Sequence, residues 1–199
     1  MRSDQRPRRR GGRQRPPLEA DERQQLIPTY ITSRAELNEA EQVNISDADG
    51  WAFSRQRDVL DAAFLLRLHK RMLGDVWRWA GNYRTTERNI GIEAWRIPAE
   101  LAQLLDDVRF WIAAETYGPD EICVRFHHRL VAIHPFPNGN GRLARMAADL
   151  LAVKLGRPRF AWGRSELVAP ARARATYIAA LQAADRHEIA ALLRFARPD

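Results

Sequence analysis

The sequence predicts a mainly α-helical domain with one small β-hairpin. Apolar residues recur at spacings of three and four along most of residues 26–197, which is the period of an amphipathic helix. Hydrophobic residues make up 45% of the 199 residues, enough to bury one sizeable core. The chain shows no internal repeat and no second low-complexity break after residue 26, so we expect one globular domain.

The first elements carry local start and stop signals. Ser33 is expected to start a helix, because Glu36 three residues later completes a capping box. A second helix follows, with its apolar face formed by Leu60, Phe64, Leu65, Leu68 and Met72. The Gly81-Asn82 turn, and Gly91 between two isoleucines, favour a short strand or hairpin over residues 82–98.

The rest of the chain continues the helical pattern. Helices are expected over residues 101–111, 122–133, 142–155 and 176–195, the last as one helix or two. Pro135 and Pro137 separate the second of these from the third.

The formal net charge of +7 comes almost entirely from the N-terminus. Residues 1–15 contain seven arginines and one aspartate, which leaves 25 basic and 24 acidic residues in the rest of the chain. We therefore expect a near-neutral domain behind a basic, disordered arm at residues 1–25, with an N-terminal helical region at 26–58 and the main domain at 59–197. The arm, chiefly residues 1–17, is suited to nucleic acid or another acidic partner, or is a solvated segment without a specific partner.

Compartment signals are few. Cys123 is the single cysteine, so no intrachain disulfide is expected and a reducing compartment is favoured. No apolar region follows the basic N-terminus and no run approaches 18 apolar residues, so we expect a cytoplasmic protein without membrane contact. Only two of the 32 basic residues are lysine, a bias typical of a GC-rich and therefore bacterial genome.

The segment most informative about chemistry is His134-Pro-Phe-Pro-Asn-Gly-Asn-Gly-Arg-Leu-Ala-Arg145. It sets a titratable imidazole before a glycine loop that opens a helix, and a helix N-terminus favours anions. Arg142 and Arg145 are three residues apart, so both guanidinium groups can face one polyanion. The pattern predicts general-base chemistry at a phosphorus centre.

This segment resembles the signature of the Fic/Doc (Fido) family, and the chain after residue 26 resembles the Fic-type group called mobile mystery protein B. The narrower likeness includes residues 31–42, 77–84 and 160–164. The resemblance implies a Fic-type helical bundle with a small β-hairpin flap. It also implies a protein adenylyltransferase that moves AMP from ATP to a Ser, Thr or Tyr hydroxyl of a target protein.

Site residues follow from the same resemblance. His134 would be the general base, and Phe136 would anchor the loop in the core. Gly139, Asn140 and Gly141 would form an anion hole for phosphates, while Arg142 and Arg145 would contact phosphate, Arg145 at the γ-position. Tyr177 and Asp185 lie where family members contact adenine and ribose, although Tyr177 could equally pack between helices.

Asn138 departs from the family pattern, which has Asp or Glu as a Mg²⁺ ligand there. An amide oxygen can still hold Mg²⁺ but lacks the charge, so weaker metal dependence or lower turnover is expected. Doc-type members also carry Asn there and phosphorylate their targets, but they replace the second loop glycine with Lys. Gly141 is intact, so AMP transfer is favoured over Doc-like kinase chemistry and over a catalytically silent binding module.

Two further features have regulatory or docking roles in the family. Residues 32–38 resemble an inhibitory helix motif, in which Glu36 would pair with the second motif arginine; the alternative is that Glu36 only completes the capping box. The hairpin at residues 88–97 would be the flap that binds target backbone through Asn89, Ile90, Gly91 and Ile92. Its alternative role is a structural hairpin over the core. The resemblance also implies a toxin-like role beside a DNA-binding operon partner.

Overall fold

Helices dominate the part of the chain that the computed structural model describes, which is residues 18, 20–163 and 170–198. The mainly α prediction is therefore confirmed. The basic segment 1–17 and Arg164 lie outside the described residues. The helices are α1 (Ala20–Gln25), α2 (Arg34–Phe53), α3 (Ala62–Leu73), the short 3-10 helix η1 (Ala94–Arg96), α4 (Ile97–Ala113), α5 (Pro119–Ile133), α6 (Asn140–Lys154), α7 (Pro170–Asp185) and α8 (Ala190–Ala196).

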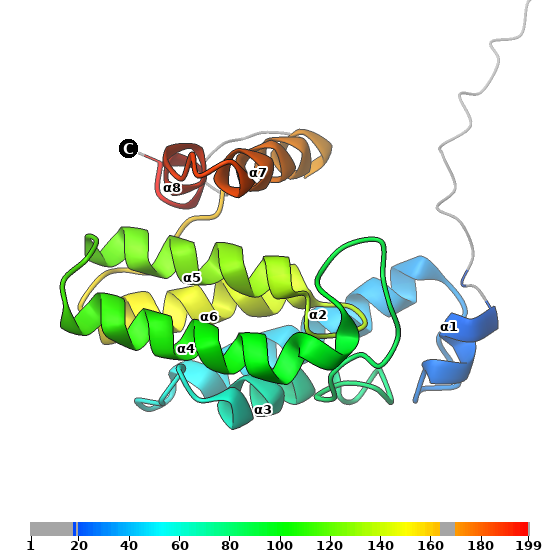
Figure 1. Cartoon of the computed structure of the whole chain (residues 1–199). Coiled ribbons are helices and arrows are strands. Elements are labelled where there is room, and N and C mark those ends of the chain that lie inside the picture. Colours follow the sequence, from blue (N-terminus) through cyan, green and yellow to red (C-terminus); the bar gives the residue numbers. More distant parts are fainter. Residues whose placement is uncertain (1–17, 19, 164–169, 199) are drawn as a thin grey trace, which may run out of the picture.

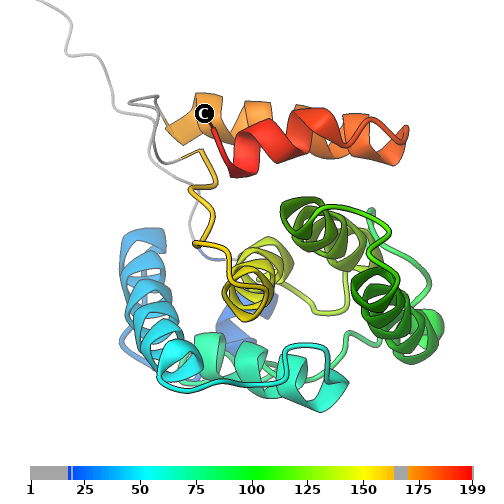
Figure 2. The ribbon, with the colours of Figure 1, turned by 90° about the vertical axis from the view of Figure 1, so that its left-hand side faces the viewer.

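Helix α6 lies in the middle of the bundle (Figures 1 and 2). It packs against α5 and also contacts α2 and α3, while α4 covers α5 and the α7–α8 pair rests on α5 through α8. Its buried face is rich in fully buried alanines: Ala144, Ala147, Ala148 and Ala152. Small side chains let neighbouring helices approach closely, so the sequence of α6 suits a central position.

The capping-box prediction for α2 is confirmed. Ser33 is the N-cap: its hydroxyl accepts from the Glu36 N–H, and the Glu36 carboxylate accepts from the Ser33 N–H. The buried face of this helix combines apolar and polar side chains: Leu37, Glu41, Asn44, Ala48 and Ala52. A buried glutamate requires partners, and Glu41 has two, Trp77 and Arg142 of α6.

Ordered structure begins earlier than predicted. We expected disorder through residue 25, but residues 20–25 form α1, and Leu18 before it is buried. Leu26 then forms an isolated antiparallel bridge with Trp77. Apolar anchoring by Leu18 and Leu26 thus joins this segment to the folded domain, so the predicted boundary at residue 26 is wrong.

The predicted hairpin is not formed. Residues 83–93 contain bends but no strand, and they run as a loop into η1. The backbone N–H groups of Arg84 and Ile92 donate to the carbonyls of Pro135 and Ile133, and the Arg84 guanidinium donates to the carbonyls of Thr86 and Ile92. These residues are therefore bonded to the end of α5, to the loop after it and to the Arg84 side chain in place of a strand ladder. We call residues 84–93 the flap loop.

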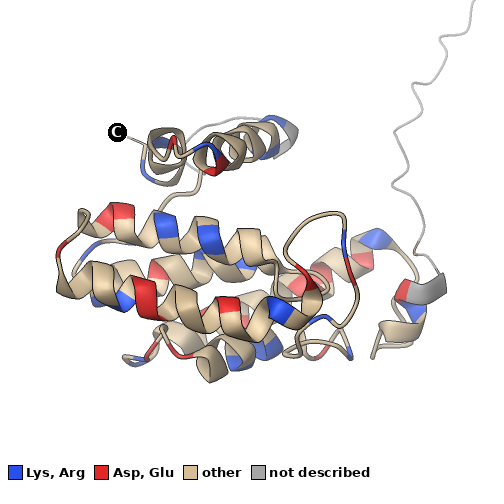
Figure 3. Ribbon diagram, in the orientation of Figure 1, with Lys and Arg blue, Asp and Glu red and all other residues tan. Residues whose placement is uncertain are grey.

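Basic and acidic residues are interspersed over the helices (Figure 3). Several form short-range ion pairs, such as Arg125 with Glu121 and Arg96 with Glu93. This agrees with the near balance of charge expected for the chain beyond residue 15. None of the helices in the described part of the chain has the length and apolar character that a membrane crossing requires.

Candidate active site

The loop between α5 and α6 turns at two left-handed positions. His134 is the C-cap of α5 at φ 54° and ψ 59°, and Gly139 is the N-cap of α6 at φ 82°. Gly139 has no room for a side chain, because a Cβ there would lie 2.6 Å from Leu73 Cδ1. We call residues 134–141 the motif loop; it joins His134, at the C-terminus of α5, to the N-terminus of α6.

Asn140 closes the motif loop on itself. Its buried side chain accepts from the Phe136 N–H at 2.9 Å and donates to the Phe136 carbonyl at 2.8 Å. The resemblance assigned Asn140 to the anion hole, and this side chain is instead occupied in shaping the loop. What Asn140 and Gly141 can offer an anion is their main-chain N–H groups, which lie in the first turn of α6 and have no acceptor within that helix.

His69 of α3 packs against the same loop, although the sequence analysis did not identify it. Its ring stacks on Phe136 with centroids 3.7 Å apart, Nδ1 accepts from the Gly81 N–H at 2.9 Å, and Nε2 lies 3.0 Å from the Asn138 carbonyl. These contacts require a neutral ring that donates through Nε2. Burial accordingly lowers the pKa of His69 to about 4.

His134 is half-buried beneath the flap loop. A Cβ on Gly91 would lie 2.6 Å from His134 Cβ, so the two backbones are in close contact. Burial lowers the pKa of His134 below its usual value, with Arg84 and Arg88 lowering it further, while a hydrogen bond to the Val131 backbone opposes the shift. A neutral imidazole at physiological pH is the form that a general base needs.

Arg142 meets a carboxylate that the sequence reasoning missed. Its Nη1 lies 2.5 Å from Glu41 Oε2 of α2, and the other Glu41 oxygen accepts from Trp77 Nε1 at 2.7 Å. The Glu41 side chain is only 9% exposed. A usable signal existed, because Glu41 shares the i, i+4, i+7 face of α2 with Leu37 and Asn44.

Glu36 does not occupy the place that the resemblance gave it. Its carboxylate accepts from the N–H groups of Thr32 and Ser33 and from the Thr32 hydroxyl, at 2.8–3.0 Å. Hydrogen bonds from the Thr32 and Ser33 backbone lower its pKa, with further bonds from their hydroxyls. This exposed side chain is committed to the start of α2, whereas Glu41, five residues later, contacts the motif.

The second motif arginine lies beside Tyr177. Arg145 Nε donates to the Gly141 carbonyl at 3.1 Å, and its guanidinium carbon lies 5.4 Å from the centre of the Tyr177 ring. The Tyr177 hydroxyl lies 3.1 Å from Nε2 of the buried His127. The fold therefore brings Tyr177 of α7 to the motif. Asp185, the other residue assigned to the nucleotide, has its Oδ1 atom 2.8 Å from Nε2 of His128.

Asn138 is exposed, and its Oδ1 accepts from the Gly139 N–H at 2.7 Å. One neutral oxygen, already sharing a hydrogen bond, suits a cation whose other ligands come from phosphate and water, as is common for Mg²⁺. No cluster of three or more His, Cys, Asp or Glu side chains suited to a metal occurs among the described residues.

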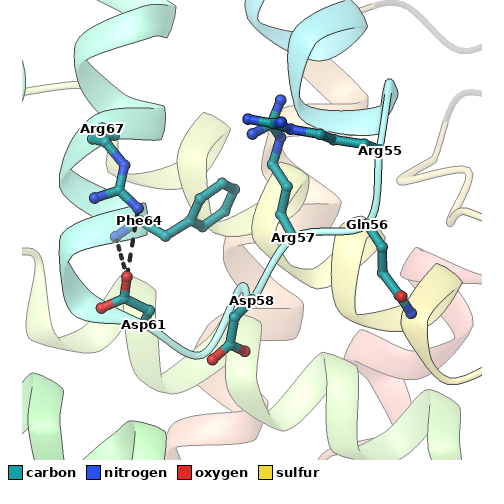
Figure 4. A pocket seen from close by; sticks show the side chains of 7 residues that line it. All are labelled: Arg55, Gln56, Arg57, Asp58, Asp61, Phe64 and Arg67. Carbon is teal, nitrogen blue, oxygen red and sulfur yellow. Dashed lines mark hydrogen bonds and ion pairs between the residues drawn. The ribbon is translucent and has the colours of Figure 1, made fainter.

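A surface cavity of about 310 Å³ lies elsewhere, at the α2–α3 connection. Asp61, which lines it, is the N-cap of α3 and accepts from the N–H groups of Ala63 and Phe64. Figure 4 shows the seven lining residues: Arg55, Gln56, Arg57, Asp58, Asp61, Phe64 and Arg67. The cavity contains no motif residue and is separate from the candidate active site.

Comparison with known proteins gives this site a family. Residues 59–152 match the sequence profile of the Fic/DOC family. Protein adenylyltransferase fic-1 of Caenorhabditis elegans is 30% identical over 146 residues, which are 71% of this chain and 27% of that protein. Protein adenylyltransferase Fic of Drosophila melanogaster is 30% identical over 135 residues, or 66% of this chain and 26% of that protein. The chain thus belongs to the Fic/DOC family and spans about a quarter of the length of these relatives.

Solved structures share the fold. Fic-1 of C. elegans superposes with a TM-score of 0.66 at 24% identity, covering 84% of this chain and 50% of that one. The BepC protein of Bartonella tribocorum, solved with bound AMPPNP, has a TM-score of 0.63 at 22% identity over 83% of this chain and 88% of its own. The Fic-type helical fold expected from the motif is therefore confirmed.

Protonation of buried histidines should limit stability in acid. The folded pKa of His69 is about 4 and that of His127 about 3, both lowered mainly by burial, while an unfolded histidine titrates near 6.5. Below about pH 6.5 only the unfolded state takes up these protons, so folding loses free energy as pH falls toward 4. At about 1.4 kcal/mol per pH unit and group, the unfolding free energy should drop by roughly 2 kcal/mol per histidine between pH 7 and 5.

Urea unfolding of the full chain at the two pH values measures this drop. His69→Gln should be less stable at pH 7, since it loses the stack on Phe136, yet should show a clearly smaller pH dependence. His187→Asn, which alters an exposed ring, is the matched control and should keep the dependence of the wild type. An undiminished pH dependence in His69→Gln would contradict the assignment.

Proposed function

We propose that this chain is a Fic-type protein adenylyltransferase that transfers AMP from ATP to a hydroxyl side chain of a target protein. The observation that carries the proposal is the motif loop, which joins the N-terminus of α6 to His134, a histidine with a lowered pKa that lies against the flap loop. The names of the curated relatives and the nucleotide bound by BepC support the same activity.

The chemistry assigned to His134 is proton removal. The target oxygen attacks the α-phosphorus of ATP and a new O–P bond forms, while the bond from that phosphorus to the bridging oxygen breaks and pyrophosphate leaves. The hydroxyl proton passes to His134. The lowered pKa of His134 keeps its imidazole in the neutral form that can accept this proton.

We assign phosphate binding to the N-terminal turn of α6. The N–H groups of the first turn favour negative charge, and donors held in place before reaction stabilise charge that develops at phosphorus. We assign Gly139, Asn140 and Gly141 to this hole through their main chain, with Arg142 and Arg145 on phosphate oxygens. Tyr177, beside Arg145, is assigned to the nucleotide as well.

Mg²⁺ is proposed to accompany the nucleotide, with Asn138 as its protein ligand. When bound, the ion would offset negative charge on the phosphates. With a neutral amide in place of a carboxylate, most ligands must be phosphate and water, so the chain itself holds the ion weakly.

Target recognition is assigned to the flap loop at Asn89, Ile90, Gly91 and Ile92. Ile90 is 62% exposed there, and Trp95 in the adjoining η1 is 80% exposed. Large apolar side chains left exposed beside a catalytic base favour contact with a protein. Nucleic-acid contact by residues 1–17, a DNA-binding operon partner and a bacterial, cytoplasmic setting stay predictions.

Labelled ATP tests the activity and separates it from the alternatives. The full chain is incubated with Mg²⁺ and with ATP labelled at the α- or the γ-phosphate, and its self-modification is followed by intact mass. We expect α-label and the mass of one adenylyl group. His134→Ala should abolish the increment, whereas His187→Asn should retain it. Label from the γ-phosphate alone would establish Doc-like kinase chemistry, and no increment in the wild type would favour a silent module.

We further propose that α2 inhibits the enzyme through Glu41, in place of Glu36. The Glu41 carboxylate occupies Arg142, and Trp77 holds that carboxylate by its indole N–H. A nucleotide phosphate would have to displace Glu41 from Arg142. Because this pair lies largely out of solvent, the competition should be stronger than for a surface ion pair.

Glu41→Gln is the sharpest test of inhibition. Glutamine can still accept from Trp77 but loses the charge that holds Arg142, so ATP affinity and self-modification should each rise by roughly tenfold, as for the loss of one charge-assisted hydrogen bond. Glu36→Gln is the matched control on the same helix and should leave both near wild-type values. Activation by the Glu36 variant, with none by the Glu41 variant, would contradict this assignment.

A further inference from the structure

Arg84 is a buried cation bonded to main-chain carbonyls. Its side chain has no solvent exposure. Nε donates to the His134 carbonyl at 2.7 Å, Nη1 to the Thr86 carbonyl at 3.1 Å, and Nη2 to the Ile92 carbonyl. Burying a guanidinium is unfavourable unless its donors are satisfied, so three carbonyl partners make this position strongly specified.

The first partner sets the backbone of the general base. His134 adopts a left-handed conformation that costs a residue with a side chain about 1 kcal/mol or more. Its N–H still bonds Leu130, but its carbonyl lies beyond the α5 ladder and is taken by Arg84. The Arg84 N–H also donates to the Pro135 carbonyl at 2.9 Å, so the same residue bonds two consecutive positions of the motif loop.

The other two partners set the flap loop. Thr86 and Ile92 lie on either side of the segment that contains Gly91, and a Cβ on Gly91 would lie 2.6 Å from His134 Cβ and 2.9 Å from Arg84 Nη2. The flap loop therefore rests directly on both residues. One planar guanidinium bonds both the His134 carbonyl and the carbonyls of the flap loop, a geometry that the single ammonium of lysine does not reproduce.

We propose that Arg84 is a positioning residue that sets the distance between the target-binding flap loop and the general base His134. A target hydroxyl held along the flap loop would then meet the imidazole in a reactive geometry. The role rests on the proposed adenylyl transfer, and it requires Arg84 to influence transfer without contacting ATP. Misplacement of reacting groups by about 1 Å is enough to lower rates by about a hundredfold.

The Arg84→Lys variant keeps the positive charge but removes the planar guanidinium that donates to three carbonyls. In the full chain, binding of a non-hydrolysable ATP analogue should stay within about twofold of wild type, while single-turnover AMP transfer falls on the order of tenfold to a hundredfold. Amides of residues 87–92 should exchange hydrogen faster. Arg109→Lys is the matched control, because Arg109 also donates to a carbonyl, that of Leu60. Arg109 lies near the C-terminal end of α4, whereas the flap loop precedes the N-terminal end of this helix.

The Arg84→Gln variant tests the pH dependence of the transfer rate, which would not change if Arg84 only supported the fold. The cations near His134 are Arg84 and Arg88, and the carboxylate of Glu87 lies 3.7 Å from Arg84. Loss of the Arg84 charge should shift the acidic limb of the transfer rate to higher pH, while Arg84→Lys leaves it close to wild type. Should both arginine variants fail to fold, Gly91→Ala, which displaces the flap loop from His134, should lower transfer with ATP binding retained.

The possible failures are distinct. A wild-type chain that transfers no AMP overturns the proposed function. A wild-type chain that transfers AMP, with an Arg84→Lys variant that matches Arg109→Lys in rate and flap exchange, overturns the role of Arg84. A parallel loss of ATP binding and transfer overturns it as well, because Arg84 would then support the fold alone.

Discussion

The packing of Phe136 is the constraint on which the candidate active site depends. Its ring is buried and stacked on His69, and its main-chain N–H and carbonyl both bond the Asn140 side chain. These contacts hold the motif loop closed between α5 and α6. If the loop opened, the spacing between His134 and the N-terminus of α6, on which the proposed chemistry depends, would change.

Charge in the site is arranged by a few buried contacts. Burial lowers the pKa of His134, and the Arg84 cation, which donates to three carbonyls, lowers it further, which favours the base form. Arg142 pairs with the buried carboxylate of Glu41, and this ion pair joins α2 to the motif. The proposed inhibition by α2 rests on this pair, because a phosphate would have to replace the carboxylate at Arg142.

Sequence signals predicted the secondary structure correctly where residues close together in the sequence determine it. The start of α2 at Ser33, the helix at 97–113 and the break at the motif loop all follow from capping residues, 3.6-residue periodicity and prolines. The hairpin expected at 82–98 is absent for a non-local reason, since the backbone N–H groups of Arg84 and Ile92 donate to the carbonyls of Pro135 and Ile133. Residues 20–25 joined the fold because of apolar contacts that a basic, polar composition conceals.

By itself the sequence determined the helical class, the capping box and the twelve-residue motif, because each rests on spacing along one chain segment. Only the tertiary structure decided which glutamate meets that motif. Glu36 and Glu41 lie five residues apart on α2, and the rotation of the helix directs Glu36 to its own N-terminus and Glu41 to Arg142. The roles of His69 and Arg84 were likewise settled in space, since each bonds backbone groups more than 40 residues away.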